Sequence, residues 1–304
     1  MRKVRNTIRL GKRGERWRQL TAVVAVALCL LLASGCRRDK AASDGRPLLA
    51  ATTPAIAWMV QEIGGDDVNV VSLLPSGSDA ESYEPDMATM KSLSGSSTLY
   101  TLSTPGFEQS TVRRVADATG KTLSVTDLSV GIERIDDSHS GGYDPHYLSS
   151  PANARKVAAA ILADMERRYP DKAETMRARA DALDKRLAAA SDSVKTLLGN
   201  PGEGCAIVAI HPSLGYYARD YGLRQISLEE NGKEVTPRGL ERGLAEAHKA
   251  GAGVLVYERT HSPDRATLYA AELGIPTIGV DFNAADFARQ YTQIARAITG
   301  PTRQ

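Results

Sequence analysis

A long apolar stripe between Asp171 and Leu198 constrains this chain more than any other feature. Its members recur at alternating spacings of four and three, which places them on one face of a helix. They are Met176, Ala180, Leu183, Leu187, Ala190, Val194 and Leu197. Pro170 before the stretch and Gly199-Asn200-Pro201 after it are typical boundaries for a helix, here roughly 40 Å long. We expect a strut between two α/β lobes; the alternative is a long surface helix of a single domain.

Residues 1–35 have the pattern of an export signal. Eight basic residues and one acidic residue lie in the first twenty positions, and the apolar run from Thr21 to Leu32 follows. This run is shorter than the roughly twenty residues that a bilayer core requires. It ends in Ala33-Ser34-Gly35-Cys36, which resembles a bacterial lipobox. We expect lipidation of Cys36, with plain secretion as the alternative, and a flexible tether over residues 36–46.

Removal of this signal reverses the sign of the net charge. The full sequence has 38 basic and 36 acidic residues, so the remaining 269 residues have 30 basic and 35 acidic ones, a net charge of about −5. A basic surface for nucleic acid is therefore not expected. A chain of this length is sufficient for two domains of ordinary size.

Short apolar runs alternate with helical patterns on both sides of the strut, which predicts βα units and parallel sheets. In residues 47–170 the expected strands are Leu48–Thr52, Val68–Leu74, Thr98–Leu102 and Leu123–Val125. In residues 199–304 they are Ala206–Ile210, Gln225–Leu228, Val254–Tyr257 and Thr277–Val280. We therefore expect two (β/α)4-type lobes joined by residues 171–198. Ligands of open parallel sheets bind beyond the carboxyl ends of the strands, so candidate residues are those after each strand.

Four residues on the predicted loops are of types that bind metal ions. They are Glu81, His146, His211 and Asp281. Pro145 and Pro212 lie beside the two histidines and limit the freedom of the backbone there. Two carboxylates bring a charge of −2, which a divalent cation would neutralise. Each residue alone is more typical of a surface or turn position, so the metal-site hypothesis depends on their joint placement.

A series of motifs covers nearly the whole chain after the signal. They are Leu73-Leu74-Pro75 through Tyr83-Glu84-Pro85, Asp144-Pro145-His146 with Ser150-Pro151-Ala152-Asn153-Ala154, His211-Pro212 with Tyr216-Tyr217-Ala218-Arg219-Asp220-Tyr221-Gly222-Leu223, Gly232-Lys233-Glu234-Val235-Thr236-Pro237, and Asp281. In this order they resemble the zinc/manganese-type solute-binding proteins of ABC transporters (cluster A-I, ZnuA/TroA-like). The resemblance implies two lobes joined by a rigid helix, with a metal ion between them held by two ligands from each lobe. It also implies an ABC membrane permease and its ATPase as partners.

The chain departs from the family pattern at the first ligand and on both sides of the second. Glu81 stands where the family usually has a histidine, so a carboxylate is expected there, with Glu84 or water as alternatives. The tryptophan that usually follows Asp-Pro-His is absent. Zinc receptors of the family often have a long histidine- and acid-rich loop before that motif. Here the segment Glu133–Tyr143 has a single histidine, His139, and such a composition is typical of a solvated linker.

The expected ion is Zn²⁺, because two imidazoles favour it and His211 stands where manganese-type members more often have a carboxylate. Mn²⁺ or iron is the alternative, since two carboxylates suit those ions as well. We expect His248 and His261 to be structural or surface groups. Glu258 ends the strand before His261. The sequence leaves two positions for its side chain, the wall of the cleft and the protein surface.

A zinc hydrolase is the main alternative function, with His146, His211 and Asp281 as ligands and Glu81 as general base. The chain has no His-Glu-x-x-His and no Gly-x-Ser-x-Gly motif. Four protein ligands would also close the open position that catalytic zinc needs. A third hypothesis, an iron chelate or corrinoid between the lobes, predicts a cleft lined by aromatic or arginine side chains, and the chain has only three Phe and two Trp. We therefore expect a monomeric, lipid-anchored receptor that is not an enzyme and that delivers a captured ion to the permease.

Overall fold

The computed structural model describes residues 45–93, 95–118, 123–137, 142–199, 205–229 and 235–300. The expected export signal and Cys36 lie outside the described residues, as do His139 and residues 232–234 of the predicted motif. The described residues from Pro47 onward belong to one compact unit, to which the following description applies. No helix in the described part of the chain combines the length and the apolar character needed to cross a bilayer.

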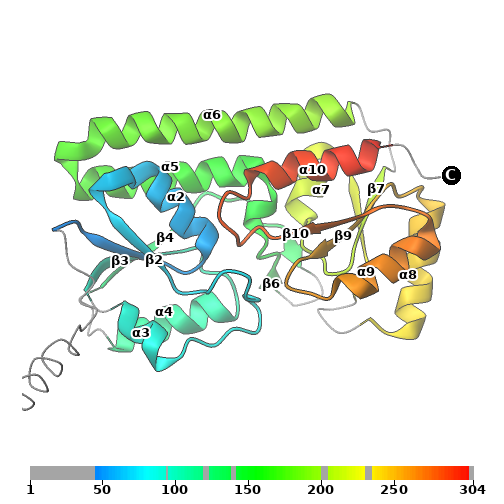
Figure 1. The fold of residues 1–304 in the computed structure, drawn as a ribbon, viewed down its shortest axis with the longest axis horizontal. Coiled ribbons are helices and arrows are strands. Elements are labelled where there is room, and N and C mark those ends of the chain that lie inside the picture. Colours follow the sequence, from blue (N-terminus) through cyan, green and yellow to red (C-terminus); the bar gives the residue numbers. More distant parts are fainter. Residues whose placement is uncertain are drawn as a thin grey trace, which may run out of the picture. The chain divides into compact units, whose positions relative to one another are not determined.

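The first lobe is built on a four-stranded parallel sheet with the strand order β2-β1-β3-β4 (Figure 1). Its strands are β1 (Leu48–Ala51), β2 (Asn69–Ser72), β3 (Ser96–Thr101) and β4 (Ser124–Asp127). Its helices are α2 (Pro54–Gly64), α3 (Met87–Ser92), α4 (Phe107–Ala118) and α5 (Pro151–Arg168). Helix α5 has a side-chain cap, because the Ser150 side chain accepts from the Asn153 N–H and Pro151 takes the first helical position.

The second lobe repeats the scheme with a parallel sheet of order β10-β9-β7-β8. Its strands are β7 (Ala206–Ala209), β8 (Arg224–Ser227), β9 (Leu255–Glu258) and β10 (Thr277–Val280). Its helices are α7 (Gly215–Tyr221), α8 (Pro237–Lys249), α9 (Pro263–Leu273) and α10 (Ala288–Thr299). A hairpin of β5 (Asp136–Asp137) and β6 (Gly142–Tyr143), which the sequence pattern did not indicate, lies between the two sheets along the chain.

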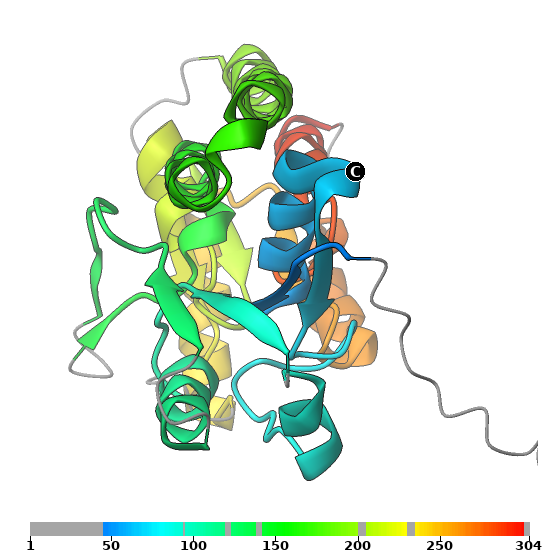
Figure 2. The same ribbon diagram turned by 90° about the vertical axis from the view of Figure 1, so that its left-hand side faces the viewer.

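The long helix α6 (Ala173–Leu198) joins the two lobes, which confirms the predicted fold class. It packs against α2 and α5 of the first lobe and against α10 of the second (Figures 1 and 2). Five stripe residues are buried, and Ala190 and Leu197 pack against the same core with partial exposure. Gly199 ends the helix with φ of 63°, a conformation that glycine adopts without steric cost.

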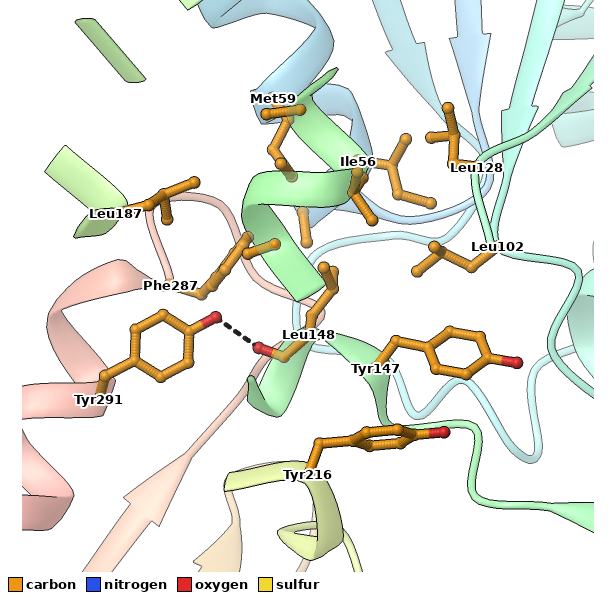
Figure 3. Close-up of a cluster of buried hydrophobic side chains, with 14 of the residues drawn as sticks. Ile56, Met59, Leu102, Leu128, Tyr147, Leu148, Leu187, Tyr216, Phe287 and Tyr291 are labelled. Atoms are coloured by element: carbon orange, nitrogen blue, oxygen red, sulfur yellow. Dashed lines mark hydrogen bonds between the residues drawn. The ribbon is translucent and has the colours of Figure 1, made fainter. Parts of the chain in front are cut away.

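One hydrophobic cluster contains residues from both lobes and from α6 (Figure 3). Ile56 of α2 and Leu187 of α6 share this cluster with Phe287 and Tyr291, which lie at α10. The hydroxyl of Tyr291 donates a hydrogen bond to the Leu148 carbonyl over 2.6 Å. The lobes are therefore joined by a common core as well as by the long helix.

Candidate metal site

A cavity of about 1040 Å³ lies between the two lobes. All four predicted ligands line it, and several of its acidic residues and histidines lie at or after the carboxyl ends of parallel strands, where open parallel sheets place their ligands. Those after the parallel strands include Glu81, His211, Glu229, Glu258 and Asp281, while Asp144 and His146 follow the hairpin strand β6 (Gly142–Tyr143). The cleft thus combines side chains from loops of both lobes.

Glu81, His146 and His211 form the most compact group. One possible ligand atom of each lies within 4.8 Å of those of the other two. Oε1 of Glu81 is 3.1 Å from Nε2 of His211 and 3.9 Å from Nε2 of His146. Ligand atoms of a tetrahedral zinc site are about 3.3 Å apart, given bonds of about 2 Å. The three side chains are therefore close to the spacing that one ion requires.

His146 is oriented by Asp144, which precedes it by two residues. One carboxylate oxygen of Asp144 accepts the His146 backbone N–H and lies 2.8 Å from its Nδ1. A Cβ on Gly215 would lie 2.3 Å from the other oxygen, so only glycine fits beside this carboxylate. Burial opposes charge on the ring, but the hydrogen bond and the charge of Asp144 raise the pKa of His146 overall. With Nδ1 engaged, Nε2 is left to face the cavity.

His211 follows β7 and is held in the same way by Glu229, which follows β8. Its Nδ1 lies 2.9 Å from Oε2 of Glu229, and its side chain is only 8% exposed. Among the described residues, no aligned hydrogen bond reaches its buried Nε2, because the contact with Glu81 is an ion pair without hydrogen-bond geometry. A buried nitrogen in this state is costly, and a bound ion would satisfy it.

The Glu81–His211 pair shifts both pKa values strongly. Its contact with His211 lowers the pKa of Glu81 to about 2, against the opposing effect of burial. Burial alone would lower the pKa of His211, but Glu229 and Glu81 together raise it to about 10. At neutral pH the metal-free cleft therefore holds an ionised Glu81 and a proton on His211, with which a metal ion must compete.

Asp281 lines the cavity but lies outside the compact group of three. Its Oδ1 accepts the Asn283 N–H over 2.9 Å, and the Gln290 side chain bonds both its N–H and its carbonyl. Burial raises the pKa of Asp281, and the negative charge of Glu258 adds to this effect. The backbone of Asp281 is thus fixed at the cleft wall, with the carboxylate turned to its own loop.

Several site residues were not assigned from the sequence. Asp144 and Glu229 position the two histidines. Glu258, for which the sequence left both the cleft wall and the surface as alternatives, lies on the cleft wall. The rule that selected the loops after strands would also have found Glu229 and Glu258, since they lie at or just after the ends of β8 and β9. Glu84, the alternative to Glu81, is exposed and does not line the cavity.

The edge of the site includes His261, which we expected to be a structural or surface group. Its ring stacks on that of His211 with a centroid distance of 6.4 Å, and its side chain is 40% exposed. Its Nδ1 is 3.8 Å from Oε2 of Glu258. His261 therefore lies between the enclosed histidine and solvent.

Comparison with known proteins agrees with this architecture. The family model described as zinc-uptake complex component A, periplasmic (ZnuA), matches residues 49–299. The zinc-binding lipoprotein AdcA of Streptococcus pneumoniae is 25% identical over 274 residues, which cover 84% of this chain and 54% of AdcA. This chain thus spans about half the length of AdcA. The manganese-binding lipoprotein MntA of Halalkalibacterium halodurans is 25% identical over 263 residues, 84% of this chain and 86% of MntA.

Solved structures show the same fold. A crystal structure of ZnuA superposes with a TM-score of 0.77 at 25% identity, covering 85% of this chain and all of that one. The solute-binding protein FpvC of Pseudomonas aeruginosa, in complex with Mn²⁺, gives a TM-score of 0.71 at 21% identity over 83% of this chain and 98% of that one. The resemblance read from the sequence motifs is confirmed: the chain belongs to the zinc-uptake complex component A (ZnuA) family of zinc/manganese-type solute-binding proteins.

Proposed function

We propose that the protein captures a divalent transition-metal ion in the cleft between its lobes, with zinc preferred. The proposed ligands are Glu81, His146, His211 and Asp281. The observation that carries this proposal is the compact group of the first three, in which the buried Nε2 of His211 has no aligned hydrogen bond among the described residues. The zinc-binding and manganese-binding relatives support the class of ion.

The surrounding residues favour binding with little rearrangement. Asp144 and Glu229 already hold the two imidazoles with Nε2 toward the cavity, so the ordering cost for these ligands is small. Asp281 would complete the set by turning its carboxylate from the Asn283 N–H toward the ion. Two nitrogen and two oxygen donors suit Zn²⁺, and Mn²⁺ or iron is the alternative.

We also propose that the protein is exported, anchored by a lipid on Cys36, and delivers the ion to an ABC-type import permease driven by its ATPase. The basic and apolar segments of residues 1–35 and the lipobox-like sequence support export and anchoring. AdcA and MntA are both lipoproteins, which agrees with this arrangement. The zinc hydrolase hypothesis finds no support among these relatives.

Metal analysis of the purified protein tests the capture function. After removal of bound metal with a chelator, titration is expected to give one zinc ion per chain, bound more tightly than manganese. Glu81→Ala and His211→Ala should each weaken binding strongly. Glu84→Ala is the matched control, because Glu84 lies in the same exposed segment as Glu81 but does not line the cavity.

Two outcomes would contradict the proposal. Parental affinity in both Glu81→Ala and His211→Ala would place the metal elsewhere. Metal-dependent turnover of ester, phosphoester or peptide substrates by the zinc-loaded protein would favour the hydrolase hypothesis instead.

A further inference from the structure

Glu258 occupies a position that the four proposed ligands do not explain. It ends β9 and is paired in register with Val280, which ends β10, so it lies beside Asp281 at the same edge of the sheet. Its side chain is 23% exposed and lines the cavity. One of its oxygens is 4.0 Å from Nε2 of His146, and the other is 3.8 Å from Nδ1 of His261.

Glu258 and Glu81 both lie close to the same atom, Nε2 of His146. The two carboxylates lie 4.0 Å and 3.9 Å from the same nitrogen, the one that Asp144 leaves free for an ion. Neither Glu258 nor Asp281 belongs to the compact group of three, but Oδ1 of Asp281 is bonded within its own loop, whereas Glu258 faces the nitrogen of His146. Among the described residues, Glu258 is therefore the carboxylate of the second lobe that lies next to Nε2 of His146.

Within the described part of the chain, the ion-pair neighbours of the Glu258 carboxylate are the two imidazoles of His146 and His261, with no lysine or arginine among them. By contrast, Glu246, another carboxylate on the cavity wall, pairs with Arg224 over 2.9 Å. The Glu258 carboxylate is thus available to a cation that enters the cleft.

A third carboxylate affects zinc and manganese differently. Zn²⁺ is satisfied by four tetrahedral ligands, which two imidazoles and two carboxylates already supply. Mn²⁺ favours oxygen ligands and a larger coordination number, so it gains more from an additional carboxylate. We propose that Glu258 binds the ion beside His146 and determines how well the site accepts manganese relative to zinc. This inference rests on the proposed metal-capture function.

The test is the ratio of the two metal affinities in Glu258→Gln, which preserves the size of the side chain and removes its charge. Competition titration against a fluorescent chelator should show manganese affinity lowered at least tenfold, while zinc affinity falls less than about threefold. Glu258→Asp keeps the charge and should retain part of the manganese affinity. Glu272→Gln, at an exposed position on α9, is the control and should leave both affinities unchanged.

A spectroscopic measurement separates ligation from a general charge effect. Electron paramagnetic resonance of bound Mn²⁺ should change between the parent and Glu258→Gln and remain unchanged in Glu272→Gln. Equal losses of affinity for both metals, or no loss for either, would overturn the inference while leaving the capture function intact. If the parent protein binds neither metal, the proposed function itself fails. Thermal unfolding followed by circular dichroism shows whether each variant is folded.

Discussion

The orientation of His211 depends on one carboxylate from the neighbouring strand. Glu229 holds Nδ1 of His211 over 2.9 Å and so directs Nε2 to the cavity. Glu229→Gln is expected to lower zinc affinity by about 10–100-fold, because an amide holds the ring less strongly and no longer fixes its tautomer. Competition with a chromophoric chelator measures this change. Glu246→Gln is the control, and equal loss in both variants would show that only the charge of the cleft matters.

The proton on His211 links metal binding to pH. Contacts with Glu229 and Glu81 raise the pKa of His211 to about 10, so in the metal-free protein this ring stays protonated below that pH. Zinc binds the neutral ring, and the proton must leave. We expect at least one proton released per ion at pH 7.5, and an apparent affinity that rises with pH up to about 10.

Calorimetric titration in buffers of different ionisation enthalpy counts the released protons. Glu81 contributes none in this range, because its pKa is lowered to about 2 and it is already ionised. Zinc affinity that does not change between pH 6 and pH 8 would contradict the protonated state of His211.

The candidate ligands could be found from the sequence because their types and their positions after strands are both visible there. The roles of Asp144 and Glu229 depend on loop conformation and on distances between loops. Asp144 acts through the fold of its own loop, and Glu229 acts across the distance between the loops after β7 and β8. Sequence spacing does not supply these distances. The turn of Asp281 toward its own loop is likewise a matter of backbone geometry that a motif does not contain.

At the scale of elements, α6 depends on its apolar stripe rather than on its own helix propensity. Leu187 is fully buried in the cluster shared by both lobes, whereas Lys185 on the same helix is exposed. Leu187→Ala should lower the free energy of unfolding by about 2–5 kcal/mol through lost apolar contact and a residual cavity. Lys185→Ala should change it by less than about 0.5 kcal/mol. Urea unfolding measures both, and similar small effects would show that the stripe does not anchor the helix.

The order of the strands in both lobes was predicted correctly, but some boundaries were not. The strand expected over Val68–Leu74 extends only over Asn69–Ser72. The hairpin of β5 and β6 was missed, because strands of two residues are too short to show alternation.

At the scale of the molecule, the contacts behind the cleft limit how far the lobes can move. The Ala55 N–H, at the start of α2, donates to the Asn283 carbonyl beyond β10 over 2.8 Å. Trp58 of α2 meets Phe287 edge to face with centroids 5.4 Å apart. These contacts join the two lobes directly, and α6 packs on helices of both. A wide hinge opening would have to break this common core.

We therefore expect metal binding to produce small tilts of the lobes and ordering of loops. The radius of gyration from small-angle X-ray scattering should differ by less than about 1 Å between metal-free and zinc-loaded protein. Tyr291→Phe removes the hydrogen bond to the Leu148 carbonyl within the common core and should enlarge this difference, since it weakens the contact that opposes opening. A decrease of several ångströms on loading of the parent protein would instead indicate a wide closure. The shared core would then have to rearrange during capture, and the rigid-strut interpretation of α6 would be wrong.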